Sequence, residues 1–240
     1  MRLDDPEAVR AQYTTEVGLE TRRSLYVGGE GDDPRDVAFA AVAEVVPQEV
    51  LEVGCGPGEF ASRIQQELGC RVVAVDTSER MVALAGERGV DARVGDVQQL
   101  AFEAGVFDCV VAAWMLFHVP DLDRGLAELA RVLRPGGRLV AVTNSERHLQ
   151  EARELACVDM SGKVPFSREN GETSLLRHFT IVSRRDVDGW VTFEDREAVR
   201  RYIASMITES ARAELVREFA GPLRAGSRAT VFVADKAELA

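Results

Sequence analysis

A glycine-rich turn between an apolar strand and a helix constrains this chain more than any other feature. The segment VLEVGCGPGEF, residues 50–60, places Gly54, Gly56 and Gly58 within five positions. The residues before the turn are mostly apolar, as in a buried strand, and EFASRIQQEL after it carries apolar residues at helical spacing. A glycine turn at such a junction is typical of folds that hold a nucleotide-like cofactor at the N-terminus of the helix.

The alternation of strands and helices continues through the first 145 residues. Near-continuous apolar strands alternating with amphipathic helices are typical of a parallel sheet covered on both faces. Capping residues mark several ends, such as the serine before and the glycine after the second helix. The predicted strands are residues 49–53, 71–76, 91–96, 107–114 and 137–144, and the predicted helices are 59–68, 78–89 and 121–133.

The pattern changes after Asn144, where helices and strands no longer alternate regularly. Two more strands for the sheet are expected here, with helices between them that the sheet layers cannot all accommodate. These helices form the natural lid. The predicted helices are residues 145–160, 174–179, 196–206 and 211–219, the predicted loop is 161–173, and the strand-like segments are 180–187, 190–193 and 229–235.

At 240 residues the chain is expected to form a single α/β domain. Its parts differ in their expected roles, from a cofactor-binding core to segments that close over a substrate. The expected parts are an N-terminal lid segment at 1–35, the cofactor-binding core at 36–145, a C-terminal part with substrate-lid insertions at 146–226, and a closing strand at 227–236.

The charge and the cysteines narrow the partners and the compartment. A formal net charge of −11 repels phosphate backbones and anionic membranes, so we expect neither nucleic acid nor membrane as a partner. Four scattered cysteines and three histidines predict reduced thiols and no metal site. The first residues carry no apolar leader pattern, and no apolar run is long enough to span a bilayer. The expected location is cytoplasmic.

The glycine turn alone fits more than one cofactor. Gly56, Gly58 and Ala61 match the dinucleotide fingerprint GxGxxG/A, and Asp76 lies at the distance where an NAD site carries its ribose-binding acid. A plain tight turn at a strand end also remains open.

Three carboxylates at strand ends favour a different cofactor. Glu52 ends the first strand, where it would repel a pyrophosphate but suit an ammonium group. Asp76 can accept both hydroxyls of a ribose, and Asp96 can accept from an exocyclic amine such as that of adenine. Because the carboxyl ends of parallel strands share one edge, the pattern predicts a cationic, adenosine-bearing, phosphate-free ligand. S-adenosylmethionine fits that description.

The chain resembles the class I S-adenosylmethionine-dependent methyltransferases of the small-molecule type. This resemblance implies a Rossmann-like, seven-stranded, mostly parallel sheet with helices on both faces and a helical lid. It covers roughly residues 45–145, with a variable tail beyond. The motifs that carry it are VLEVGCGPG, VVAVDTSERMV, ARVGDVQQLAF, FDCVVAAWMLFHV and LARVLRPGGRLVAVTNS, in that order.

The resemblance also implies which residues contact the cofactor. Glu52 would orient the amino group through water, and the glycines would let the backbone approach the homocysteine part. Asp76 would hold the ribose, and Trp114 would border the methionine portion. The full implied set is Glu52, Gly54, Cys55, Gly56, Gly58, Asp76, Thr77, Met81, Asp96, Val97 and Trp114, in which Thr77 and Met81 flank the adenine and Asp96 and Val97 read its edge.

The acceptor side is less defined by the sequence. His118 is a candidate general base because histidine titrates near neutral pH, although a structural role bracing the turn after it is preferred. Candidate residues of the substrate side and the lid are Tyr13, Arg22, Arg23, Asn144 and His148.

The sequence therefore predicts a methyltransferase that modifies an oxygen or nitrogen atom of a small molecule, in natural-product biosynthesis by resemblance alone. Alternatives left open are a quinone or lipid-like acceptor, an NAD(P)-binding oxidoreductase, and a non-catalytic binder of S-adenosylmethionine.

Overall fold

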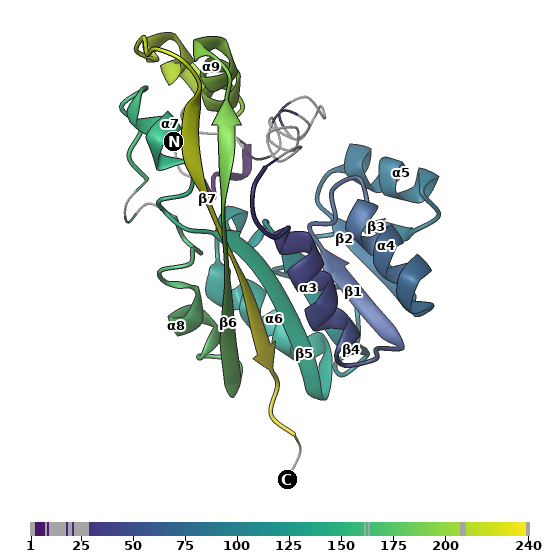
Figure 1. Cartoon of the computed structure of the whole chain (residues 1–240). Coiled ribbons are helices and arrows are strands. Elements are labelled where there is room, and N and C mark those ends of the chain that lie inside the picture. Colours follow the sequence, from purple (N-terminus) through teal and green to yellow (C-terminus); the bar gives the residue numbers. More distant parts are fainter. Residues whose placement is uncertain are drawn as a thin grey trace.

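A twisted seven-stranded sheet with the order β3-β2-β1-β4-β5-β7-β6 organises the protein (Figure 1). The computed structural model describes residues 3–7, 9, 18, 21, 29–160, 162, 164–206 and 210–238. The first five strands are parallel neighbours, whereas β7 runs antiparallel to both β5 and β6. The strands are β1 (Glu49–Val53), β2 (Arg71–Asp76), β3 (Asp91–Val94), β4 (Phe107–Ala113), β5 (Leu133–Asn144), β6 (Ile181–Phe193) and β7 (Leu223–Asp235).

Helices cover both faces of this sheet and bury two apolar cores against it. One core contains side chains of α3 (Pro34–Ala43), α4 (Glu59–Leu68) and α5 (Glu79–Glu87), and the opposite core contains those of α6 (Leu122–Val132) and α8 (Gly171–Leu175). The predicted Rossmann-like arrangement of a mostly parallel sheet between helices is therefore confirmed.

Local chemistry explains where several of these helices begin. The side chains of Ser78 and Asp121 each accept a hydrogen bond from a backbone N–H in the first turn of α5 and α6, which satisfies one of the unpaired donors there. Helix α3, which the sequence analysis did not predict, starts from an Asp33 cap followed by Pro34. The helix after the glycine turn, α4, begins and ends at the predicted residues.

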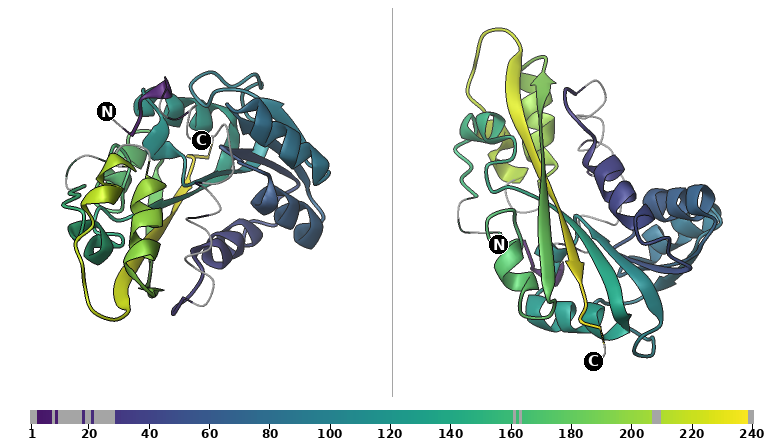
Figure 2. Two further views of the ribbon diagram at one scale, coloured as in Figure 1. Left: turned by 90° about the horizontal axis from the view of Figure 1, so that it is seen from above. Right: turned by 60° about the horizontal axis from the view of Figure 1, so that its bottom comes forward.

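A third apolar core lies away from the sheet layers. Residues Leu223–Arg228 of β7 pair only with β6, because the pairing of β7 with β5 ends at Ala229. This extension of β6 and β7 carries α7 (Gln150–Glu154), α9 (Arg196–Ala204) and the 3-10 helix η2 (Ser210–Leu215), which share a core with it. We call these three helices and the paired extension the cover; Figures 1 and 2 show α9 and α7 beside the projecting ends of β6 and β7.

Several predicted bounds in the tail are wrong. Segments 180–187 and 190–193 form the single strand β6, because Gly189 stays in the strand and leaves room for the Glu30 backbone, which forms an antiparallel bridge with Trp190. Glu30 exchanges two hydrogen bonds with Trp190 at this point, and a Cβ on Gly189 would lie 2.2 Å from the Glu30 carbonyl oxygen. Strand β7 begins at Leu223, six residues before its predicted start at residue 229.

The predicted helices of the tail are also shorter than expected. The helix at 145–160 reduces to α7, because Leu149 adopts a positive φ of 50° just before it. In place of the helix predicted at 174–179, α8 spans Gly171–Leu175 and so begins inside the predicted loop 161–173, and the helix at 211–219 is the 3-10 helix η2. Within the described ranges, no helix has the length and apolar content needed to cross a membrane.

Candidate functional site

One cavity of about 740 Å³ joins the carboxyl edge of the sheet to the cover. Its lining includes the glycine turn after β1, the ends of β2, β4 and β5, and side chains of α7 and α9. Binding cavities in proteins commonly have volumes of roughly 300–1,000 Å³, so this one is of ligand size. Its two-part lining allows two ligands to meet: one at the sheet and one under the cover.

The glycine turn holds a backbone that other residues adopt with strain. Gly54, Gly56 and Gly58 have φ values of 65°, 54° and 79°, in the left-handed region. A Cβ on Gly54 or Gly58 would collide with Met115 or Ala85 at 2.6 Å, whereas a Cβ on Gly56 would meet open space. Gly56 lines the cavity, so a side chain there would occupy the space in which a ligand would approach the backbone.

Glu52 is a buried acidic residue with one unpartnered carboxyl oxygen. The residue is 2% exposed, lines the cavity, and its Oε2 atom accepts no hydrogen bond. Burial raises the pKa of Glu52 to about 8, with a smaller contribution from the charge of Asp76, while the Ala61 backbone N–H lowers it. A cationic donor reaching Oε2 would satisfy the orphaned oxygen and favour the ionised form.

Asp76 connects the second strand to the glycine turn. Its carboxylate accepts hydrogen bonds from the backbone N–H groups of Gly56 and Ser78, both at 2.9 Å. Burial raises the pKa of Asp76, and these backbone donors partly offset that effect. Asp76 therefore holds the turn in shape as well as lining the cavity beside Thr77.

Asp96 and Val97 follow β3 at the same edge and line the cavity. The Asp96 carboxylate accepts from the Gln98 backbone N–H at 2.8 Å and from the Gln98 side-chain amide at 2.9 and 3.1 Å. We call Glu52, Asp76 and Asp96 the carboxylate rim. Met81, the remaining residue expected near an adenine, is fully buried in α5 and is absent from the described lining.

Trp114 leaves β4 in a strained conformation. Its φ is 53°, which is unusual for a bulky residue and typical of functional loops. The backbone N–H donates to Val142 at 2.8 Å and the indole N–H donates to the Asn144 side-chain oxygen at 3.0 Å. Asn144, expected on the acceptor side, thus orients the Trp114 ring at the cavity wall.

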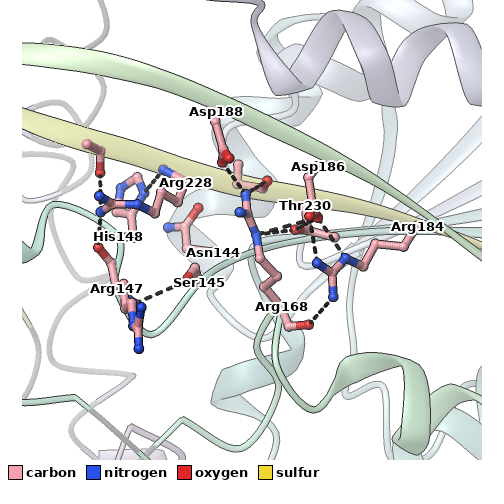
Figure 3. A network of polar contacts seen from close by, with 12 residues as sticks. Asn144, Ser145, Arg147, His148, Arg168, Arg184, Asp186, Asp188, Arg228 and Thr230 are labelled. Atoms are coloured by element: carbon pink, nitrogen blue, oxygen red, sulfur yellow. Dashed lines mark hydrogen bonds and ion pairs between the residues drawn. The ribbon is translucent and has the colours of Figure 1, made fainter.

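His148 is buried at the cavity, in a polar network that includes residues of β7 (Figure 3). Its Nδ1 accepts the Arg228 backbone N–H at 3.0 Å, and burial together with the charge of Arg153 lowers its pKa to about 3. The imidazole is therefore neutral at pH 7. In the same network, Arg168 is paired with Asp188 at 2.6 Å and with Thr230 at 2.7 Å.

His118 lines the cavity after β4 and connects to the N-terminal segment. Its Nδ1 lies 2.9 Å from the Leu3 carbonyl oxygen. Because a carbonyl oxygen only accepts hydrogen bonds, Nδ1 carries the proton. The ring thereby connects the segment after β4 to the backbone of Leu3. The other candidates of the lid, Tyr13, Arg22 and Arg23, lie outside the described residues.

Sequence reasoning missed Arg153, a buried arginine of α7 that lines the cavity. A signal for it existed: Arg153 lies four residues after Leu149 and three before Ala156, so a basic residue stands in the apolar stripe of the segment. Tyr202, Met160 and Met206, which the sequence did not single out as site residues, line the same cavity.

Comparison with known proteins relates the part of the chain that contains the carboxylate rim to one family. Residues 51–141 match the family model described as "Methyltransferase domain". A probable tocopherol O-methyltransferase of Oryza sativa subsp. japonica is 37% identical over 129 residues, covering 49% of this chain and 36% of the relative. A ubiquinone biosynthesis O-methyltransferase of Xanthomonas oryzae pv. oryzae is 39% identical over 111 residues, covering 43% of this chain and 46% of the relative.

Among solved structures, the [4+2]-cyclase SpnF has a TM-score of 0.64 at 19% identity and covers 96% of both chains. This likeness shows a common fold over nearly the whole length. The chain spans less than half the length of the curated relatives named above.

Proposed function

We propose that the chain is a class I S-adenosylmethionine-dependent methyltransferase, similar to its curated relatives, and that it transfers a methyl group to an oxygen or nitrogen atom of a small molecule. The observation that carries this proposal is the unpartnered Oε2 of buried Glu52 beside the glycine turn. A cofactor with an ammonium group satisfies that oxygen, whereas a dinucleotide would bring a pyrophosphate toward a carboxylate. The rim therefore favours S-adenosylmethionine over NAD(P).

Each part of the cofactor has a residue suited to it. Glu52 would bind the amino group and Asp76 would accept from the ribose hydroxyls, using lone pairs that its two backbone donors leave available. The open space at Gly56 would admit the homocysteine backbone. Asp96 would accept from the adenine amine, with Val97 beside it, and Trp114 would border the methionine portion.

Bound S-adenosylmethionine supplies an electrophilic methyl group on a sulfonium centre. The chain's own task is to hold the acceptor atom in line with that methyl and to exclude water, and such positioning can remove about 7–11 kcal/mol of barrier. The cover, which closes the far side of the cavity, suits both purposes.

A neutral hydroxyl acceptor must also lose a proton. His118, which lines the cavity after β4, is the candidate for this role, because imidazoles commonly act as general bases. His148 is a poor base at pH 7, since burial lowers its pKa to about 3. Replacing His118→Asn would lower kcat while leaving cofactor affinity unchanged.

The charge and the cysteines support the remaining parts of the proposal. A net charge of −11 favours a small-molecule acceptor over nucleic acid. Four free cysteines favour the reducing cytoplasm. The named activities of the tocopherol and ubiquinone relatives make a phenolic, lipid-like acceptor the second candidate, which the apolar side chains of Met160, Val164 and Met206 in the cavity would accommodate.

Incubation with isotopically labelled S-adenosylmethionine and a panel of phenols, catechols, hydroxy acids and amines tests the proposal. We expect a product that carries the labelled methyl, lost in Asp76→Ala and kept in the surface variant Asp91→Asn. Cofactor binding without product from any panel member would favour a non-methylating binder. Binding of NAD(H) with none of S-adenosylhomocysteine would overturn the proposal.

A further inference from the structure

The cavity has a second pole, opposite in charge to the carboxylate rim. Its wall under the cover includes Arg153, Tyr202, Met160, Val164 and Met206. None of these residues belongs to the strand ends that form the rim. The inference below rests on the proposed function and concerns the acceptor that would occupy this pole.

Arg153 is buried but unpaired. It is 4% exposed; one terminal nitrogen donates to the Glu146 backbone carbonyl, and its Nε has no hydrogen-bond partner. Within the described ranges, no carboxylate forms an ion pair with it. Burial lowers the pKa of Arg153, and its electrostatic interactions with Tyr202, Asp159, Glu151 and Glu154 only partly counter this.

The contrast with Arg168 shows that this chain can pair a buried arginine when the role is structural. The Arg168 side chain is 11% exposed, and it binds Asp188 at 2.6 Å, Thr230 at 2.7 Å and Asp186 at 3.5 Å (Figure 3). A buried guanidinium without such partners costs free energy that folding alone does not repay. In a cavity wall, an anionic ligand group would complete it.

We propose that Arg153 binds a carboxylate of the methyl acceptor and thereby fixes the acceptor's orientation under the cover. A guanidinium presents a planar set of donors that matches a carboxylate, and the unpartnered Nε belongs to that set. The neighbouring wall selects the rest of the molecule: Met160, Val164 and Met206 provide an apolar surface. The acceptor class is therefore an apolar or aromatic acid that also carries the hydroxyl or amine to be methylated.

The remaining polar groups of this pole favour a single negative charge. Glu146 also lines the cavity, where its carboxylate accepts from the Gly162 N–H at 2.7 Å and would repel a second negative charge. His148 is neutral and adds no positive charge. One guanidinium beside one carboxylate suits a carboxylate monoanion better than a phosphate dianion.

Matched probes isolate the charge from the rest of the ligand. Hydrocinnamate and its primary amide have the same apolar body, and phenyl phosphate adds the dianion. Calorimetric titration of each into the full chain saturated with S-adenosylhomocysteine should give hydrocinnamate an affinity at least about tenfold above the amide, as expected for a hydrogen bond to a charged group. Phenyl phosphate should bind more weakly than hydrocinnamate.

Variants then assign the effect to the residue. Arg153→Met should reduce the acid-to-amide preference to less than about twofold, and Arg153→Lys should retain part of it. The exposed Arg147→Gln, in the segment that leads into the same helix, should retain it fully. A melting temperature of Arg153→Met equal to or above that of the parent is also expected, because removing an unpaired buried charge removes its desolvation cost.

The outcomes separate the two proposals. If S-adenosylhomocysteine binds and hydrocinnamate shows no preference over its amide, the acid-binding role of Arg153 is overturned while the cofactor assignment stands. Persistence of the preference in Arg153→Met, or tighter binding of phenyl phosphate, would also overturn it. If S-adenosylhomocysteine itself does not bind, the proposed function fails first. Lower stability of Arg153→Met with an unchanged preference would show a structural role only.

Discussion

The carboxylate rim and the cover both place polar groups at one cavity, but they do so by opposite routes. The rim takes Glu52, Asp76 and Asp96 from the ends of neighbouring parallel strands, within an unbroken sheet. The cover takes Arg153 and His148 from a segment around a short helix and holds them against an extended strand pair. One pole of the cavity is thus acidic and set by sheet register, and the other is basic and set by distant packing.

This difference between the rim and the cover indicates which part of the fold can change its cavity-lining residues independently of the rest. The rim depends on the main sheet, which also supplies most of the protein's core, so changes there are felt globally. The cover has its own small core, built from α7, α9, η2 and the ends of β6 and β7. Such a unit can alter its lining without disturbing the sheet, and the following predictions test that separation.

The largest expected effect comes from truncating one aromatic in each region. Phe107 in the main core and Phe193 in the cover are both fully buried, and a Phe→Ala change in such places costs about 3–5 kcal/mol. Phe107→Ala should lower global stability and cofactor binding together. Phe193→Ala should weaken protection of cover amides against hydrogen exchange and leave S-adenosylhomocysteine affinity within about twofold. Equal loss of protection in both regions would contradict the separation.

A pair of glycine substitutions divides stability from binding within the rim. Gly58→Ala forces a side chain into Ala85 at a φ of 79°, and we expect a loss of roughly 2–4 kcal/mol in chemical denaturation. Gly56→Ala meets open space and should cost only about 1–2 kcal/mol for the left-handed backbone. Its cofactor affinity should nevertheless fall, because the new methyl group points into free space at the cavity. Unchanged cofactor affinity in Gly56→Ala would show that the cofactor does not bind at the glycine turn.

The Glu52→Gln substitution should raise the free energy of unfolding at pH 7 and weaken cofactor binding. The pKa of this carboxyl rises from 4.5 to about 8 on folding, so the parent loses stability as pH rises through that window. At pH 7 the variant should therefore be more stable by about 2–3 kcal/mol, and the gain should vanish near pH 4.5. Denaturant titration at the two pH values measures it. A variant that is less stable at pH 7 would show that Glu52 already has a partner within the protein.

Acidification should destabilise the cover, whereas it should remove the destabilising effect of Glu52. His148 has its pKa lowered from 6.5 to about 3 on folding, so its contribution to stability is complete above pH 6.5 and is lost as pH falls toward 3. At about pH 5 this amounts to roughly 1–2 kcal/mol, within the region where Glu52 gains stability by being protonated. Hydrogen exchange at pH 7 and pH 5 should show the cover loosening first. His148→Gln should reduce that loosening, and its persistence would assign the acid sensitivity elsewhere.

The sequence predicts the strands and helix around the carboxylate rim more accurately than it predicts the cover. Strands 49–53 and 71–76 and helix 59–68 are confirmed to the residue, because short-range apolar patterns and the glycine turn determine them. The shared edge of the three rim carboxylates follows from strand direction alone. The unpartnered Oε2 of Glu52 does not, since it depends on burial by surrounding elements.

The tail was predicted less well because its structure depends on contacts between distant residues. Gly189 predicted an interruption between two strands, but it lies within β6. The Glu30 backbone forms an antiparallel bridge beside it. The early start of β7 depends on β6 as its only partner there. Arg153 was missed since a basic residue in a helical stripe is usually a solvated one, and only the packing of the cover shows that it is buried.

Proton release on cofactor binding tests the central claim most directly, namely that an ammonium group binds Glu52. Titration of S-adenosylhomocysteine at about pH 6.5, in buffers of different ionisation enthalpy, reports protons exchanged on binding. Because Glu52 has a pKa of about 8 without ligand, ionisation beside the ammonium group should release close to one proton, and Glu52→Gln should release none and bind at least about tenfold more weakly. Binding with no proton release, or equal affinity in the variant, would contradict the account.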